Sequence, residues 1–238
     1  MISDYTIFQA KLYPVLPFLF YQAGKVKMER PTPPAISEQL ILGSGELKIL
    51  VLGESTVAGV GASQPQFTLP GQLSKLMGHN YEITNLGKNG LRISQVFSHL
   101  GGEILDHKNG VKGIFIFLGA NDCFHLTHPI RYRKHLNNVI SKLLTQFTPD
   151  WIYLADIPPV HLFPAFPALL RNYLKTQRNF LRAEMIAFAN ENQNVVFDPL
   201  TGTFNPEFFS SDGIHPSDFG YEKIAEFAFN GLKNRFLI

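Results

Sequence analysis

The chain has 238 residues, which is enough for one α/β domain with a full hydrophobic core. With 45% hydrophobic and 17% charged residues, its composition is globular and excludes a largely disordered chain. The net charge of +2, without a clustered basic stripe, argues against nucleic acid as a partner. The single cysteine, Cys123, excludes an intramolecular disulfide and suits a reducing compartment, so we expect a cytoplasmic location.

The N-terminal stretch over residues 7–23 is apolar and aromatic, and Pro14 and Pro17 interrupt it. It is too short and too broken for a transmembrane helix, and it lacks the basic region and cleavage site of a secretory signal. We favour a helix or extended arm packed on the main domain. The alternative is peripheral contact with a membrane through this arm, aided by three basic residues: Lys25, Lys27 and Arg30.

A Pro- and Gly-rich connector follows, so we predict an N-terminal arm and connector over residues 1–45 and a main domain over 46–238. In the main domain, buried apolar runs alternate with amphipathic helical segments. The expected strands are 47–52, 81–86, 111–118, 151–157 and 195–198. The expected helices are 64–77, 93–105, 129–147, 169–190 and 221–232. This alternation predicts a three-layer α/β/α sandwich with a central parallel sheet of about five strands.

Reactive side chains follow the ends of several expected strands, where ligands bind in such sheets. Ser55 comes two residues after Gly53, where the first strand is expected to turn into a helix. A serine at this position exposes its hydroxyl beside helix N-terminal amides, which suits a nucleophile, although most such serines are only helix caps. Asp212 and His215 lie three residues apart in a Gly-containing turn. The histidine can donate one ring N–H to the carboxylate and accept the serine proton on its other nitrogen.

Two further residues can stabilise an oxyanion. Asn121 follows the third expected strand and can direct a side-chain N–H at the developing charge. Gly90 lies just beyond the second strand, where a glycine lets its backbone N–H approach the same oxygen closely. Together these residues supply a nucleophile, a base, an orienting acid and oxyanion donors.

Four sequence blocks resemble the SGNH hydrolase superfamily, also called the GDSL esterases and lipases. They are Gly53-Glu54-Ser55, a block ending in Gly90, Gly119-Ala120-Asn121-Asp122, and Asp212-Gly213-Ile214-His215-Pro216. The segments 22–26 and 157–159 resemble a bacterial intracellular branch of this superfamily. The resemblance implies a flavodoxin-like fold.

The same resemblance implies a role for each matched residue. Ser55 would be the nucleophile, His215 the general base and then acid, and Asp212 its orienting partner. The oxyanion hole would be formed by the Ser55 and Gly90 amides and the Asn121 side chain. One residue departs from the family pattern: Glu54 stands where the family usually has aspartate.

Three histidines lie close to Asp122 and Cys123 after the third strand: His125, His128 and His135. We favour an ordinary loop and helix start over a metal site, and we expect no metal and no cofactor. Asp122 is expected to anchor this loop and Cys123 to be a small buried side chain. Apolar residues near the strand ends suit either ordinary core or an acyl-binding wall: Phe124, Leu126, Leu162, Phe163, Phe166, Phe208, Phe209 and Phe219.

We therefore expect a serine ester hydrolase that cleaves small-molecule acyl esters through an acyl-enzyme intermediate. One alternative is an acyltransferase that passes the acyl group to a sugar or another alcohol. A second alternative is a catalytically silent module that binds a lipid or a partner through the N-terminal arm.

Overall fold

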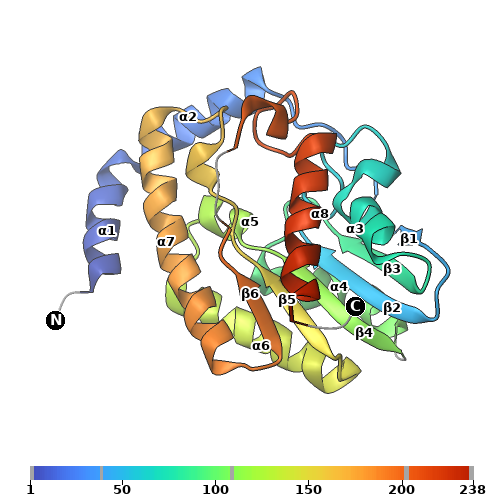
Figure 1. Ribbon diagram of the computed structural model, residues 1–238. Coiled ribbons are helices and arrows are strands. Elements are labelled where there is room, and N and C mark those ends of the chain that lie inside the picture. Colours follow the sequence, from blue (N-terminus) through green and yellow to red (C-terminus); the bar gives the residue numbers. More distant parts are fainter. Residues whose placement is uncertain (1–2, 38–39, 108–109, 201–203, 236–238) are drawn as a thin grey trace.

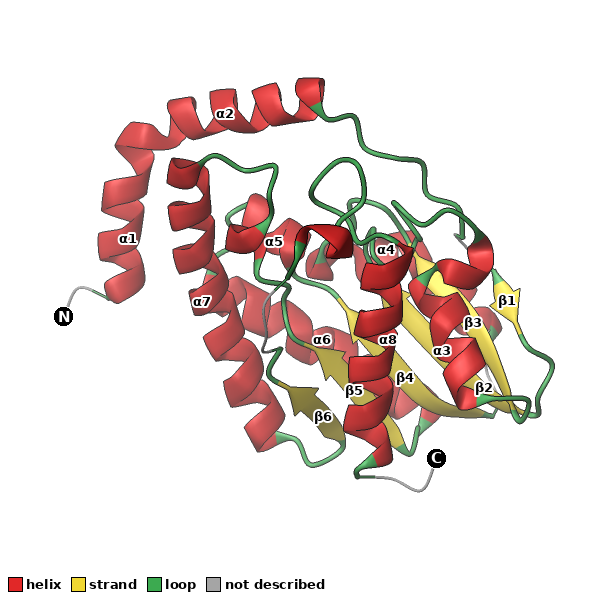
Figure 2. Ribbon diagram, turned by 45° about the horizontal axis from the view of Figure 1, so that its top comes forward, coloured by secondary structure: helices red, strands yellow, loops and turns green. Residues whose placement is uncertain are grey.

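The computed structural model describes residues 3–37, 40–107, 110–200 and 204–235. A six-stranded sheet lies between two layers of helices (Figures 1 and 2). Its strands run in the order β1-β3-β2-β4-β5-β6, with these bounds: β1 Ile41–Leu42, β2 Leu47–Gly53, β3 Tyr81–Gly87, β4 Val111–Phe117, β5 Trp151–Ala155 and β6 Val195–Asp198. Strands β2 to β6 are parallel, and β1 pairs antiparallel with β3. The predicted sandwich is confirmed, and the connector contributes β1 as an additional short edge strand.

The two faces of the sheet carry separate cores because successive side chains of a strand point to opposite faces. Ile49 and Val51 pack with one set of helices, α3 (Leu69–Met77) and α8 (Asp218–Lys233). Leu50 and Leu52 belong to the larger core on the other face. That face is covered by α4 (Val96–Asp106), α6 (Pro129–Phe147) and α7 (Ala168–Glu191). Both faces of the central strands are therefore buried from solvent, as their continuous apolar runs predict.

Some helices begin later than expected. The segment predicted as a helix over 64–77 starts with the 3-10 turn η2 (Pro65–Phe67), and α3 begins only at Leu69. The Thr68 hydroxyl caps α3 by accepting from the Gly71 N–H. Likewise, the 3-10 turn η3 (Ile93–Gln95) precedes α4. The sequence did not predict three short elements, which are too brief to show a helical period: α5 (Ala120–Phe124), η4 (Val160–Leu162) and η5 (Pro206–Phe208).

The N-terminal arm consists of α1 (Asp4–Leu12), η1 (Tyr13–Val15) and α2 (Leu16–Glu29). Tyr5 and Phe8 are buried against α7, where both rings contact the Phe180 ring. Helix α2 then leaves α1 at an angle and passes beyond the carboxyl ends of the strands (Figure 2). In the described part of the chain, no helix combines the length and apolar character needed to cross a bilayer.

The strand register brings the candidate site residues to one edge of the sheet. Gly53 at the end of β2 is paired with Gly87 of β3 on one side and with Phe117 of β4 on the other. The three loops that follow these strands therefore begin side by side. They carry Ser55, the segment up to Gly90, and Asn121, respectively.

Candidate active site

Ser55 lies in a tight loop directly after β2. Its backbone carbonyl accepts from the Val60 N–H, and the Val57 N–H donates to the Glu54 carbonyl. The segment is a succession of turns and not the helix start that the sequence predicts. Gly59 and Gly61 have φ values of +78° and +95°, which interrupt any regular helix at this point.

The loop also packs closely on the neighbouring strands, which explains why two strand ends carry glycine. A Cβ atom at Gly53 would lie 2.6 Å from the Phe117 carbonyl oxygen, and one at Gly87 would collide with the Ala58 backbone. The buried Asn85 side chain holds the loop from below by donating to the Val57 carbonyl at 3.0 Å. Asn85 was not recognised as important from the sequence, although it lies in the block that ends at Gly90.

His215 and Asp212 form a hydrogen-bonded pair. The His215 Nδ1 atom lies 2.6 Å from Asp212 Oδ2. The other carboxylate oxygen, Oδ1, accepts from the Ser210 hydroxyl and from the backbone N–H groups of Ile214 and His215, each at 2.9 Å. Burial alone would raise the pKa of Asp212, but these hydrogen bonds and the His215 charge lower it to about 2. Asp212 is thus ionised and directs Nε2 of the ring away from itself.

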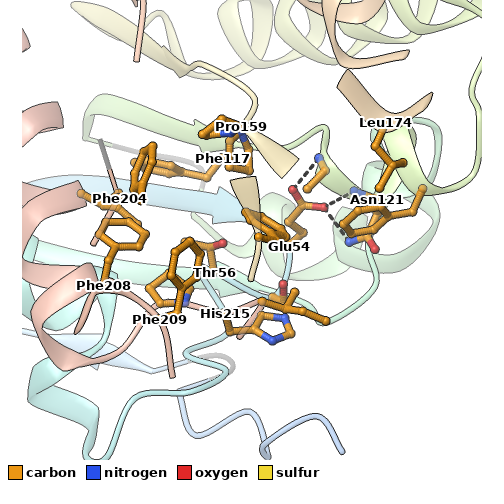
Figure 3. A pocket seen from close by; sticks show the side chains of 18 of the residues that line it. Glu54, Thr56, Phe117, Asn121, Pro159, Leu174, Phe204, Phe208, Phe209 and His215 are labelled. Atoms are coloured by element: carbon orange, nitrogen blue, oxygen red, sulfur yellow. Dashed lines mark hydrogen bonds between the residues drawn. The ribbon is translucent and has the colours of Figure 1, made fainter. Parts of the chain in front are cut away.

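Glu54 is the departure from the family pattern, and the structure shows what its longer side chain does. Glu54 is 3% exposed, and its carboxylate receives three hydrogen bonds from the start of α5. Its Oε1 atom accepts from the Ala120 N–H at 2.9 Å, and Oε2 accepts from the Asn121 N–H at 2.9 Å. The Asn121 Nδ2 atom donates to Oε2 at 2.5 Å (Figure 3). Glu54 therefore fixes the orientation of the Asn121 amide and leaves its second Nδ2 hydrogen available.

The Glu54 carboxyl group is unusual in its protonation. Burial raises its pKa to about 7, against the opposing effect of the hydrogen bonds from Asn121 and Ala120. Asp122, which lies on α5 with Ala120 and Asn121, repels the Glu54 carboxylate and raises the pKa of Glu54 further.

One cavity of about 470 Å³ joins these residues, and its volume is in the range of small-molecule sites. Ser55, Asn121 and His215 all line it. In the described part of the chain, Ser55 and His215 share no hydrogen bond; such contacts commonly tighten only when substrate binds. Phe204, Phe208 and Phe209 group on one side of Glu54, and Leu174 lies near Asn121 on the other (Figure 3).

The remaining predicted residues have mixed positions. Gly90 has a φ of +78° and open space where a Cβ would lie, but its neighbour Asn89, and not Gly90 itself, lines the cavity. Five of the eight apolar residues near strand ends line the cavity: Phe124, Phe163, Phe166, Phe208 and Phe209. The other three lie elsewhere: Leu126 packs on the larger core, and Leu162 and Phe219 are exposed.

Two structural predictions around α5 are confirmed. Asp122 anchors the loop by accepting from the Ile93 N–H at 2.9 Å and from the Thr127 hydroxyl at 2.8 Å. Cys123 is fully buried. Among the described residues, no group of three or more potential ligands is arranged to hold a metal ion.

Comparison with known proteins assigns the chain to a family. Residues 51–223 match the GDSL-like Lipase/Acylhydrolase family, and the chain belongs to it. The predicted SGNH superfamily membership is thereby confirmed. No curated protein sequence matches the chain.

Solved structures of esterases share its fold. The aryl esterase of M. smegmatis superimposes with a TM-score of 0.63 at 17% identity, covering 80% of this chain and 100% of the esterase. Esterase EstA of Pseudoalteromonas sp. gives 0.61 at 16% identity, with 79% and 97% coverage. The acetylxylan esterase Axe2 of Geobacillus stearothermophilus gives 0.59 at 17% identity, with 79% and 94% coverage. At these identities the likeness establishes the fold, and the activity rests on the site.

Proposed function

We propose that this protein is a serine hydrolase of carboxylic esters, with Ser55, His215 and Asp212 as its catalytic residues. The observation that carries the proposal is one cavity lined by Ser55, His215 and Asn121, with an ionised Asp212 holding the imidazole. Membership of the GDSL-like family supports this assignment.

In the proposed reaction, Ser55 Oγ attacks the acyl carbon and passes its proton to His215 Nε2. The carbonyl oxygen becomes an oxyanion, which the Asn121 Nδ2–H and the Ser55 and Gly90 amides stabilise. His215 then protonates the leaving alcohol, and an acyl-enzyme remains on Ser55. Water enters, gives its proton to His215 and displaces the acid, which restores the serine. Asp212 keeps Nδ1 protonated throughout, so Nε2 is free to accept.

The Ser55→Ala variant tests the proposal. Turnover of 4-nitrophenyl acyl esters is expected to disappear, while the unfolding transition and circular dichroism spectrum stay those of the wild type. Turnover within a few-fold of the wild-type rate would overturn the assignment of Ser55. Analysis of the products in the presence of added sugars or alcohols separates hydrolysis from acyl transfer.

We also propose peripheral contact between the N-terminal arm and the cytoplasmic face of a membrane. Helix α2 exposes three aromatic side chains, Phe18, Phe20 and Tyr21, at 51%, 62% and 65%. Exposed aromatic side chains of this kind suit a membrane interface, and other residues of α2, Ala23, Val26 and Lys27, line the cavity. We expect the wild-type protein to co-sediment with lipid vesicles. A Phe20→Ser, Tyr21→Ser double variant should co-sediment less. Equal sedimentation of the variant would refute this contact.

A further inference from the structure

Helix α2 and the residue that follows it contribute two cationic side chains to the mouth of the cavity. Lys27 of α2 and Arg30, its C-cap, line the cavity together with Ala23 and Val26. All four residues precede the segment 51–223 that matches the family. This part of the cavity wall is therefore an addition of this chain to the family's matched segment.

Arg30 lies over the turn that carries the proposed base. Its Nη1 atom is 2.9 Å from the position that a Cβ atom on Gly213 would occupy. Gly213 is the residue between Asp212 and Ile214, and its φ of +68° is one that glycine adopts without strain. The guanidinium is thus held beside the Asp212–His215 turn, on the side of the cavity that α2 covers.

The carboxylates of the cavity are already engaged by other groups. Glu54 is buried under its three N–H donors. Asp156 accepts from Arg182 Nε at 2.8 Å and from Arg178 Nη2 at 3.3 Å. Within the described ranges of the chain, no carboxylate lies at ion-pair distance from Lys27 or Arg30.

A neighbouring lysine shows the contrasting case. Lys25 is on the same helix, does not line the cavity, and pairs with Glu29 at 3.6 Å. The two cations at the cavity mouth therefore present positive charge that the described protein residues leave unpaired, whereas the cation on the outward side is paired.

We propose that Lys27 and Arg30 bind an anionic group, a phosphate, sulfate or carboxylate, on the alcohol portion of the ester. This inference rests on the proposed hydrolase function. His215 must reach the leaving oxygen to protonate it, so the alcohol lies against the turn that Arg30 covers. Apolar phenylalanines line much of the remaining cavity, which suits the acyl chain. The preferred substrate is accordingly an amphiphilic ester with an apolar acyl chain and a negatively charged alcohol.

A matched pair of esters tests the proposal. We would compare 4-nitrophenyl octanoate with 3-carboxy-4-nitrophenyl octanoate, which differ by one carboxylate on the leaving group. The measured quantity is the ratio of kcat/KM for the anionic ester to that for the neutral ester. Comparing this ratio between variants cancels the different intrinsic reactivity of the two leaving groups.

The double variant Lys27→Gln, Arg30→Gln is expected to lower this ratio by about three- to tenfold, mainly through KM, which is the scale of two solvent-exposed ion pairs. Arg30→Glu is expected to lower it further, because the new charge repels the anion. Lys25→Gln is the control on the same helix and should leave the ratio and the rates unchanged. In wild type, raising the salt concentration should shrink the preference through screening.

Two results would overturn the anion site. The double variant could keep the wild-type ratio, with or without an equal loss of activity on both esters, or Arg30→Glu could retain the preference. Equal loss would mean that Arg30 only supports the catalytic turn. The hydrolase function is tested separately, by the loss of ester turnover in Ser55→Ala. If that loss is observed, an unchanged ratio refutes the anion site alone. No turnover of either ester by wild type refutes the hydrolase and the anion site together.

The pair is measured both as dissolved monomers and in vesicles of neutral phosphatidylcholine. If the enzyme prefers the anionic ester when both esters are dissolved as monomers, the natural anion belongs to a soluble substrate. If the preference is seen only in vesicles, the anion belongs to a lipid headgroup. Either preference supports the proposal, and its absence in both forms refutes it.

Discussion

The buried Glu54 carboxyl group makes the stability of this protein depend on pH in an unusual direction. Its pKa is raised from 4.5 to about 7 in the folded protein because burial disfavours the charged form. Between these two pH values the folded state binds more protons than the unfolded state. The free energy of unfolding therefore falls as pH rises from about 4.5 through 7. A shift of this size corresponds to about 3 kcal/mol lost by pH 8.

The substitution Glu54→Gln removes this titration. A carboxamide is close in shape to the protonated carboxyl group and does not ionise, so the variant should lack the Glu54 contribution to the pH slope. It has one acceptor oxygen where the carboxylate has two, so at least one N–H of Ala120 or Asn121 loses its acceptor. That loss costs about 1–3 kcal/mol at every pH and leaves the slope unaffected.

Urea unfolding of both proteins at pH 5, 6, 7 and 8 gives the required comparison. For each protein we take the decrease in unfolding free energy from pH 5 to pH 8. The quantity of interest is the wild-type decrease minus the decrease in Glu54→Gln. We expect about 2–3 kcal/mol, because the unfolded carboxyl is already partly ionised at pH 5 and all other titrating groups are common to both proteins and cancel. Parallel pH dependence of the two proteins, or a wild type that gains stability relative to the variant as pH rises, would show that the reasoning about Glu54 is wrong.

Three other predictions concern the cavity. Asn121→Ala should lower kcat on the order of 10²–10³-fold with little change in KM, and a loss below threefold in steady-state assays would place Asn121 outside the oxyanion hole. Asp212→Asn should lower kcat by roughly 10³–10⁴-fold because the imidazole loses the partner that sets its tautomer. In wild type, ionised Asp212 stabilises the fold fully above pH 3.8, and this contribution is lost as pH falls through about 2. The variant should lack this pH-dependent contribution, which acid unfolding measures. Phe208→Trp should shift the preferred acyl chain of a 4-nitrophenyl ester series to shorter lengths, and an unchanged optimum would mean that the acyl chain binds elsewhere.

Much of the fold could be predicted from local pattern. Strand β4 and helix α6 are continuous, periodic and long, so apolar spacing alone marks them, and α6 spans residues 129–147 as expected. Short elements escaped prediction because five residues of α5 or two of β1 cannot show a period. Helix α3 starts later than the sequence predicts because Thr68, and not Pro65, marks its beginning.

The candidate site divides in the same way. Spacing and residue type predicted Ser55, Asn121, Asp212 and His215 as site residues, because Asp212 and His215 lie in one short turn and the others follow strand ends. The hydrogen bonds from Asn121 to Glu54 could not be read from the chain, since 67 positions separate the two residues. Only the paired ends of β2 and β4 bring them together.

The amino-acid sequence by itself determined the alternation of strands and helices and the residue types available for chemistry, because both follow from local spacing and side-chain structure. The tertiary structure decided which of those side chains share a cavity and which charges remain unpaired there. Helix α2 illustrates the difference: its apolar residues indicate a packed arm, but the position of Arg30 after it, beside the Asp212–His215 turn, depends on the packing of α1 and α2 against α7, which lies far away in the sequence. Contacts at such sequence separation arise from the burial of complementary surfaces, which no local pattern records.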